Sequence, residues 1–462
     1  MHKQRTQIAL TLVIAIVAFA FNVGLQSYMR PHARDGIYFQ EWTSDTMMQT
    51  VAIEDLSKHP FETLWNIHIQ PPGFDTLRAG LASWWSPREG LELLHKVDRS
   101  IYTVWIIVST LLSVTIFMWL SQTTKAWYAF FATLLFIPHP GVIFYSTLLE
   151  TSFLSGFLIL LTYYFLWRLA KEPSRSVLPV TLAVLSLFFT RSMFQGPWIV
   201  LFTLSLLLLR VPLKSITTFV VVCGIVMGSY LTKHYYKFET SSTHGWRGLN
   251  FCRGINSFER FSLPPYLNRV KELPAGSDEE KSLPATLVRR EKLTGAPNLN
   301  HISYVEHNKE IWRYCYEQFR KMSWSHLVSS YRENIEIYFS PSSRYVTPHV
   351  IVDTLPWRDA YDKLFSKPIL PVALITSLFL ALLTTRLRDL PSLVALLLPG
   401  LFVFAICVTA EKGENMRMKI FLEPVFYVLI ATQGYRLVSA VGRASLAAGL
   451  LFSCRLKLLG RL

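Results

Sequence analysis

The chain has 462 residues, of which 51% are hydrophobic and only 17% are charged, and its mean hydropathy is +0.31. A soluble domain of this length usually carries about 25% charged residues. The apolar residues also come in blocks long enough to cross a bilayer, which takes about 20 residues for each helix. Composition therefore predicts a polytopic membrane protein and argues against an ordinary soluble domain.

The net charge of +15 comes largely from lysines and arginines in short loops between the apolar blocks. Such loops orient membrane helices, because basic residues are retained on the cytoplasmic side. No basic module interleaved with aromatic residues, as expected of a nucleic-acid-binding domain, is present in the sequence. We therefore expect the lipid bilayer, and no nucleic acid, as a partner.

Hydropathy predicts an all-α membrane protein with about ten transmembrane helices, or ten to twelve if marginal runs are included. The predicted spans are residues 8–28, 101–120, 127–138, 142–167, 177–190, 194–209, 216–232, 368–385, 391–410 and 420–435. The run 444–454 is too short to be assigned: it lies on the membrane surface or completes a further crossing.

Every second loop of this arrangement is basic, which predicts a cytoplasmic N-terminus. The loop 29–100 and the segment 233–366 then face outward. We expect three parts: an N-terminal transmembrane module, 1–232; the outward segment, 233–366; and a C-terminal transmembrane module, 367–462. The expected location is a membrane such as the bacterial inner membrane, with the functional site facing the periplasm or the outside.

The outward segment contains enough aromatic residues to form a core. Apolar positions at helical spacing in 302–339 predict one or two amphipathic helices, and the prolines and glycines of 272–300 predict a mobile loop. Cys252 and Cys315 also lie here. They form a disulfide if the segment faces an oxidising compartment, or else remain two buried thiols.

The predicted outward loop 29–100 contains the most informative residues. Asp45 stands at the expected start of a helix whose apolar face would include Met48, Val51 and Leu56. Its simplest role is that of a helix N-cap or first-turn acid, which the helix dipole stabilises.

Farther along the same loop lies His68-Ile69-Gln70-Pro71-Pro72-Gly73, followed by a helical apolar pattern. Two prolines and a glycine fix a rigid turn and suit the entry of a helix. Helix entry alone would explain the motif.

Taken together, Asp45 and the turn resemble the first outward loop of the family C glycosyltransferases. These membrane enzymes use polyprenyl-phosphate-linked sugars and include protein mannosyltransferases and lipid A aminoarabinose transferases. In the family, an acidic residue begins a short interfacial helix, and a Pro-Pro turn leads into another. The resemblance implies that Asp45 is the catalytic base and that His68 and Gln70 contact substrate. Many members have Asp-Glu where this chain has Asp45-Thr46, which departs from the protein mannosyltransferase branch.

A second match is Glu414-Asn415-Met416-Arg417, followed by an apolar stretch and Pro424. A late Glu-x-x-Arg of this kind recurs in the family, and the resemblance implies that Arg417 binds the donor phosphate. A guanidinium suits this role because it can donate two parallel hydrogen bonds to phosphate oxygens. Glu414 would orient Arg417 or contact substrate. The alternative is an arginine that only anchors the helix at the interface.

Arg191 and Glu150 are charges near the outward ends of predicted spans. Charged residues at this depth are costly and are usually paired. Arg191 therefore either contacts a phosphate or forms a structural pair with Glu150, which is also a candidate substrate-binding residue.

The resemblance implies a glycosyltransferase that moves a sugar from a polyprenyl-phosphate donor to a lipid, glycan or protein acceptor, in an inverting single displacement. It allows a divalent metal, but the sequence contains no ligand set that requires one. The alternatives are a transporter or flippase of a lipid-linked saccharide and a noncatalytic scaffold. The unusual charges gather at the outward face rather than mid-span, which favours interfacial chemistry over transport.

Overall fold

The computed structural model describes residues 2–240, 242–243, 245, 247–255, 277–345, 352–409 and 415–459. The protein is 75% helical, and the described residues form no strand. The all-α class predicted from the sequence is confirmed.

Six helices are long and apolar enough to cross a membrane. They are α1 (His2–Met29), α5 (Gly90–Thr123), α8 (Ser152–Lys171), α11 (Leu213–Phe238), α20 (Leu390–Thr409) and α22 (Glu423–Leu459). Two bent pairs raise the count to eight if each is one span: α6 (Ala126–Phe136) with α7 (Pro140–Ser146), and α18 (Arg358–Leu364) with α19 (Ile369–Thr384). The protein is therefore an integral membrane protein by the length and composition of these helices.

The expected count of about ten spans is not confirmed. The shortfall has a physical cause, because α9 (Leu178–Thr190) and α10 (Gly196–Leu208) have only 13 residues each. A helix of 13 residues is about 20 Å long, which is shorter than the hydrocarbon core.

The predicted single span 142–167 is wrong, since the chain leaves the helix at 147–151, between α7 and α8. The backbone of this loop is held from outside, because the indole of Trp105 donates a hydrogen bond to the carbonyl of Leu148 over 2.8 Å. The break matters for function because it places Glu150 in a loop immediately before the start of α8.

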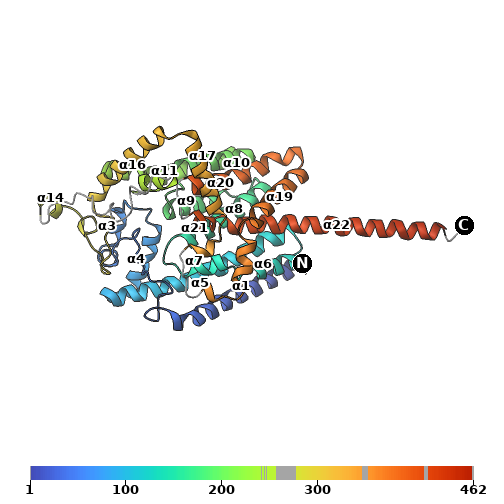
Figure 1. Ribbon diagram of the computed structural model, residues 1–462, viewed down its shortest axis with the longest axis horizontal. Helices are drawn as coiled ribbons and strands as arrows, with labels where there is room; N and C mark the ends of the chain where they lie inside the picture. Colours follow the sequence, from blue (N-terminus) through green and yellow to red (C-terminus); the bar gives the residue numbers. More distant parts are fainter. Residues whose placement is uncertain are drawn as a thin grey trace.

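The predicted outward loop and outward segment lie together at the end of the molecule opposite the N-terminus (Figure 1). The first contributes η1 (Arg30–His32), α2 (Ile53–Lys58), α3 (Pro60–Trp65) and α4 (Gly73–Trp85). The second contributes α12 (Arg247–Gly254), α14 (Asp278–Lys281), α15 (Ala285–Val288), α16 (Ser303–Lys321), α17 (Trp324–Tyr338), η3 (Ser342–Arg344) and η4 (Val352–Thr354). The two regions therefore lie side by side in the structure.

The stretch 302–339 forms the two helices α16 and α17, as expected. Cys252 and Cys315 are joined in a disulfide that ties α12 to α16, with their Cα atoms 5.3 Å apart. Of the two alternatives for these cysteines, the structure therefore has the bonded one.

The predicted loop 272–300 is more ordered than its composition suggested. Residues 272–276 lie outside the described part, and the rest includes α14 and α15. Residues 285–301, called the strap below, pack against the first loop with buried Lys292, Asn298 and Asn300. Local prolines and glycines did not reveal these contacts, because the partners are more than 200 residues away in sequence.

Three further elements complete the C-terminal part: η5 (Leu387–Asp389), α21 (Asn415–Lys419) and the long α22. The last helix runs past the bundle toward the same end as the N-terminus (Figure 1). It is one continuous helix that contains most of the predicted span 420–435, from Glu423 onward, and all of the unassigned run 444–454.

Candidate functional site

Asp45 does not begin a helix, so that prediction is wrong: α2 starts only at Ile53. Asp45 Oδ1 instead accepts a hydrogen bond from the backbone N–H of Ile53 over 2.9 Å. The intervening backbone is held by other groups, since Thr50 Oγ1 donates to the carbonyl of Ser44 over 2.7 Å. The acid thus caps a helix, but from eight residues upstream rather than from its own first turn.

Arg78 of α4 lies at the centre of a fully buried cluster around Asp45. Its guanidinium donates to Asp45 Oδ1 at 3.2 Å and to Asp75 Oδ1 at 2.6 Å. It also donates to Ser44 Oγ at 3.0 Å and to the Val51 carbonyl at 2.7 Å. None of the three charged side chains is exposed to solvent. This arginine therefore fixes the position of Asp45 relative to the helix that follows the Pro-Pro turn.

A second cation reaches this cluster from the strap. Lys292 Nζ donates to the Met47 carbonyl over 2.6 Å and lies 3.2 Å from Thr50 Oγ1. Burial lowers the pKa of Lys292 to about 7, although the charge of Asp45 opposes the change. Burial likewise raises the pKa of Asp75, opposed by Arg78. We call Asp45, Asp75, Arg78 and Lys292 the acid cluster.

The two carboxylate oxygens of Asp45 differ, because Oδ1 accepts hydrogen bonds from Ile53 and Arg78. Oδ2 is buried and has no hydrogen-bond partner among the described residues. A buried acceptor without a partner costs about 1–3 kcal/mol. Asp75 Oδ2 in the same cluster is likewise buried without a hydrogen-bond partner among the described residues.

His68 joins the first loop to the strap. Its backbone N–H donates to Asn300 Oδ1 over 2.8 Å, and its ring Nε2 lies 2.9 Å from the Asn300 carbonyl. Burial lowers the pKa of His68 to about 4. The imidazole is therefore neutral near pH 7, and Nε2 carries the proton that the carbonyl accepts. These contacts give His68 a structural role, and Gln70 beside it is also buried.

The Pro-Pro-Gly turn leads into α4, as expected, and packs on the end of α9. A Cβ atom added to Gly73 would lie 2.5 Å from the carbonyl oxygen of Phe189, a distance that no side chain tolerates. Glycine thus permits a close approach that brings the turn beside the residues leading to Arg191. Two motifs that are 118 residues apart in sequence are neighbours here.

Arg191 and Arg417 meet at Glu150. Arg191 ends α9, and its Nη2 lies 3.9 Å from Glu150 Oε2. Arg417, in α21, donates from Nη2 directly to the same carboxylate oxygen. Both guanidinium groups also donate to Ser152 Oγ, at 2.6 Å from Arg191 and 3.2 Å from Arg417. Arg417 donates further to the Tyr345 hydroxyl at 3.1 Å.

These five residues, Glu150, Ser152, Arg191, Tyr345 and Arg417, are called the arginine cluster below. The structural pair expected between Arg191 and Glu150 is formed. The predicted partner Glu414 lies outside the described residues.

The arginine cluster surrounds the N-terminus of the 20-residue helix α8, which begins at Ser152. Unpaired N–H groups and the helix dipole favour an anion at this position. The cluster places two guanidinium groups and one carboxylate at this helix start. Thr151 adds a buried hydroxyl that has no hydrogen-bond partner among the described residues. The arrangement suits a tetrahedral oxyanion, which has oxygens enough for several donors.

The backbone that carries Arg417 is fixed by the buried pair of Lys419 and Glu423. Lys419 Nζ lies 3.2 Å from Glu423 Oε1 and donates to the carbonyls of Ser340 and Phe365. Glu423 in turn accepts from the Ser342 hydroxyl at 3.0 Å. Burial lowers the pKa of Lys419, opposed by Glu423. This buried pair fixes the turn between α21 and α22 and thereby the base of Arg417.

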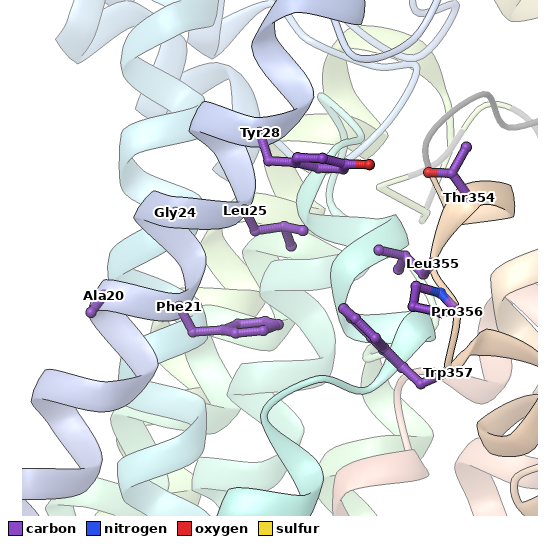
Figure 2. Close-up of a pocket in the computed structure, with 9 residues that line it drawn as sticks. All are labelled: Ala20, Phe21, Gly24, Leu25, Tyr28, Thr354, Leu355, Pro356 and Trp357. Carbon is purple, nitrogen blue, oxygen red and sulfur yellow. The ribbon is translucent and has the colours of Figure 1, made fainter.

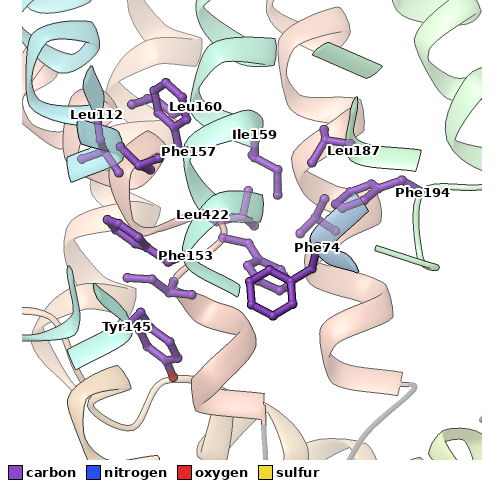
Figure 3. Close-up of a cluster of buried hydrophobic side chains, with 14 of the residues drawn as sticks. Phe74, Leu112, Tyr145, Phe153, Phe157, Ile159, Leu160, Leu187, Phe194 and Leu422 are labelled. Carbon is purple, nitrogen blue, oxygen red and sulfur yellow. The ribbon is translucent and has the colours of Figure 1, made fainter. Parts of the chain in front are cut away.

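Phe74 and Phe153, which neighbour the two clusters in sequence, belong to one group of buried hydrophobic side chains (Figure 3). Phe74 is next to Asp75 in sequence, and its ring centroid lies 6.3 Å from that of Trp105. The ring centroid of Trp105 lies 5.8 Å from that of Phe153. Phe153 directly follows Ser152 of the arginine cluster. The acid cluster and the arginine cluster therefore border a single packed layer.

A cavity of about 390 Å³ opens between α1 and the segment 354–357. In Figure 2, Phe21, Leu25 and Tyr28 project from α1 toward Leu355 and Trp357. Its walls are predominantly apolar. The helix α7 contacts both η4, at this cavity, and η3, which precedes Tyr345.

The sequence did not single out Arg78 or Lys292. Arg78 had a local signal, because it follows Asp75 by three positions on an otherwise apolar helix face. Lys292 had none, since its contacts are with residues more than 240 positions away. Among the residues that the structure describes, no group of three or more His, Cys, Asp or Glu side chains could hold a metal ion.

No protein-family model matches the chain, and no curated protein matches its sequence.

Proposed function

We propose that this protein is a membrane glycosyltransferase that takes a sugar from a polyprenyl-phosphate donor. The observation that carries the proposal is the convergence of Arg191 and Arg417 on Glu150 and Ser152 at the start of α8. Paired guanidinium groups at a helix N-terminus bind phosphate oxygens in many proteins. A lipid-borne phosphate is the anion that suits a site among membrane helices.

The apolar cavity beside α1 supports a lipid-linked donor. Its predominantly apolar lining suits an isoprenoid chain. The helix α7 contacts η4, whose Thr354 lines this cavity, and η3, which precedes Tyr345, so one short helix lies beside elements of both the proposed chain site and the proposed phosphate site.

In the proposed reaction, the acceptor hydroxyl oxygen attacks the anomeric carbon of the donor sugar. The bond between that carbon and the phosphate oxygen breaks, and polyprenyl phosphate leaves with the bonding electrons. Asp45 takes the proton from the acceptor hydroxyl through its unpartnered Oδ2. A single displacement inverts the anomeric configuration.

Asp45 is fully buried, so an acceptor can reach it only after its cover moves. The strap covers part of Asp45, since Lys292 contacts the loop that contains Asp45. The ion pairs of Arg289 in the strap with Asp55 and Glu54, called the latch below, hold the strap in place. Arg289 Nη2 donates to Asp55 Oδ1 over 2.7 Å, and its Nη1 lies 2.8 Å from Glu54 Oε2. We therefore place acceptor binding after release of this latch.

The disulfide between Cys252 and Cys315 supports an outward-facing site. Disulfides persist in the periplasm and other oxidising compartments and are rare in the cytosol. The bond lies in the segment that packs against the first loop, so both share the same compartment. We propose the periplasmic face of a bacterial inner membrane.

The test uses purified protein in liposomes, with synthetic polyprenyl phosphates bearing radiolabelled hexoses or an aminopentose, and membrane lipid, glycan and peptide acceptors. We expect sugar transfer by the wild type and a loss of about 10²- to 10⁴-fold in Asp45→Asn, because a general base is removed. The amide keeps an oxygen that can accept from Ile53 N–H. Asp35→Asn is the matched control, because Asp35 is exposed in the same loop.

Two outcomes oppose the proposal. Full activity in folded Asp45→Asn would remove Asp45 as the base. Movement of the labelled lipid across the bilayer without sugar transfer to any acceptor would favour the flippase instead.

A further inference from the structure

We infer that α3 lies on the surface of the bilayer, with the aromatic face formed by Phe61 and Trp65 inserted between the lipid headgroups. The partner of this face is therefore lipid rather than another protein. The inference depends on neither a sugar donor nor an acceptor, so it stands apart from the proposed function.

The side of α3 that points away from the protein is aromatic. Phe61 and Trp65 are four residues apart, so they lie on the same side of the helix. Phe61 is 89% exposed and Trp65 is 53% exposed. Thr63, on the opposite side, is buried, and Leu64 packs against the hydrophobic core. An exposed apolar face of this kind marks a contact with a membrane or with another protein.

The contacts of α3 with α11 place this face at the level of the bilayer surface. Lys233 Nζ in α11 donates to the carbonyl of Trp65 over 2.8 Å, and Lys237 Nζ donates to Asn66 Oδ1 over 2.7 Å. Lys233 lies 20 residues after Leu213, where α11 begins. At 1.5 Å per residue this is about 30 Å, the thickness of the hydrocarbon core. The end of α3 is therefore bonded to α11 where that helix leaves the hydrocarbon.

Exposed apolar surface also continues from α11 to α3. Val221 and Ile225 are exposed in the middle of α11, as expected of a helix that faces lipid. Tyr235 and Tyr236 are exposed near its end. Tyrosine and tryptophan gather at membrane–water interfaces because their rings are apolar and their hydroxyl or indole N–H is polar. The exposed rings of α3 thus extend an aromatic belt that begins on α11, which favours lipid over protein as their partner.

The charges next to this face favour apolar insertion over electrostatic attraction. Lys58, which ends α2, and Glu62 of α3 are both exposed and have opposite signs. Attraction to anionic lipid requires a cluster of basic residues. We therefore expect the contact to form with zwitterionic lipid and to be insensitive to salt.

This anchor is joined to the latch. Thr63 Oγ1 donates to the carbonyl of Asp55 over 3.0 Å, which ties α3 to α2. The side chain of Asp55 in turn accepts from Arg289 of the strap. A bilayer that holds α3 therefore also holds the acidic residues of the latch close to the membrane surface.

The inference is tested with a fluorescent label at position 61. The full chain is placed in phosphatidylcholine nanodiscs, and the cysteines outside the disulfide, Cys223, Cys407 and Cys454, are replaced by alanine. Phe61→Cys then carries an environment-sensitive fluorophore. Asp278→Cys is the matched control, because Asp278 is fully exposed in α14, at the far end of the molecule from the N-terminus (Figure 1). One quencher is a nitroxide on the upper acyl chain of the lipid, and the other is iodide in the water.

We expect the lipid quencher to act at least about threefold more strongly on the label at position 61 than on that at position 278, and iodide to act less strongly. Added salt should not change this result. Trp65→Cys, labelled in the same way, should behave like Phe61→Cys. Because both side chains are exposed, neither replacement empties the core.

Three outcomes would overturn the inference. Iodide quenching as strong at position 61 as at position 278 would show that the face lies in water. Protection from iodide without quenching by the lipid nitroxide would show that protein, such as a second copy of the chain, covers the face. Lipid quenching that requires anionic lipid or is lost in salt would show an electrostatic contact rather than apolar insertion.

Discussion

Replacing Arg78 by methionine should destabilise the protein more than almost any other single change. The guanidinium of Arg78 contacts both Asp45 and Asp75, and all three side chains are fully buried. Methionine fills a similar volume but leaves two carboxylates without their cation. It also removes the donors to the Ser44 hydroxyl and the Val51 carbonyl.

The expected magnitude follows from these contacts. Removing one partner of a buried ion pair costs about 3–5 kcal/mol. A buried carbonyl left without a donor adds about 1–3 kcal/mol. Since whole proteins are stable by only about 5–15 kcal/mol, the variant should lie at the edge of folding.

The assay is thermal unfolding in detergent, followed by tryptophan fluorescence. Arg88→Met is the matched control, because Arg88 pairs with Glu92 at the surface and should contribute less than about 1 kcal/mol. The double variant Arg78→Met/Asp75→Asn should recover part of the loss, since it removes one of the stranded charges. If Arg78→Met unfolds at the same temperature as Arg88→Met, the acid cluster does not have the importance assigned to it.

Three further predictions concern the first loop and the segment that packs against it. The Cys252–Cys315 bond closes a loop of 63 residues, and its reduction should lower the free energy of unfolding by about 4 kcal/mol, because the unfolded chain gains conformational entropy. The measurement is a fall in Tm on adding a reductant, and an unchanged Tm would contradict the prediction. Arg289→Met removes the ion pair to Asp55 and should speed trypsin cleavage within residues 277–301, mapped by mass spectrometry; equal rates in variant and wild type would argue against the latch. Because burial lowers the pKa of His68 to about 4 from an ordinary 6.5, the unfolded chain binds the proton first as pH falls. The contribution of His68 to the free energy of unfolding is therefore fully present above pH 6.5, and about 3 kcal/mol of it is lost as the pH falls to 4. The Tm of His68→Asn should change less with pH over this range than the Tm of the wild type. Parallel Tm profiles of the two proteins would contradict the prediction.

Hydropathy was sufficient for much of the fold. Long apolar runs predicted where helices lie because a membrane helix must satisfy its backbone within itself. The same signal gave a span count that the structure does not confirm, since it cannot tell a 13-residue apolar helix such as α9 from a full crossing. It also missed the break before Glu150, which depends on Trp105 from another helix.

The wrong helix at Asp45 has a related cause. Met48, Val51 and Leu56 have helical spacing, but the backbone between Ser44 and Val51 is bonded to distant side chains. Ser44 N–H donates to the carboxylate of Asp98, and the Val51 carbonyl accepts from Arg78. Tertiary contacts thus outweighed local periodicity around this buried acid.

Arg191 was singled out from the sequence because a charge at this depth, near the outward end of a predicted span, is usually paired. Arg417 was singled out from its Glu-x-x-Arg motif. Their common partner could be suggested for Arg191 but not for Arg417, which is 267 residues from Glu150. Lys292 carried no local signal at all, because a lysine in a polar loop is unremarkable until its burial is known.

The arginine cluster has a consequence for how the protein matures in the membrane. Its charged residues enter the bilayer with three different parts of the chain, and Arg417 arrives only with the elements that precede the last helix. Helices insert first and associate afterwards. Glu150 therefore lies near Arg191 alone until Arg417 is synthesised late in translation. A ribosome stalled before α21 would leave Glu150 and Arg191 in the membrane without Arg417. Quality-control proteases that recognise exposed polar groups among helices would therefore have a ready means of telling finished copies from unfinished ones.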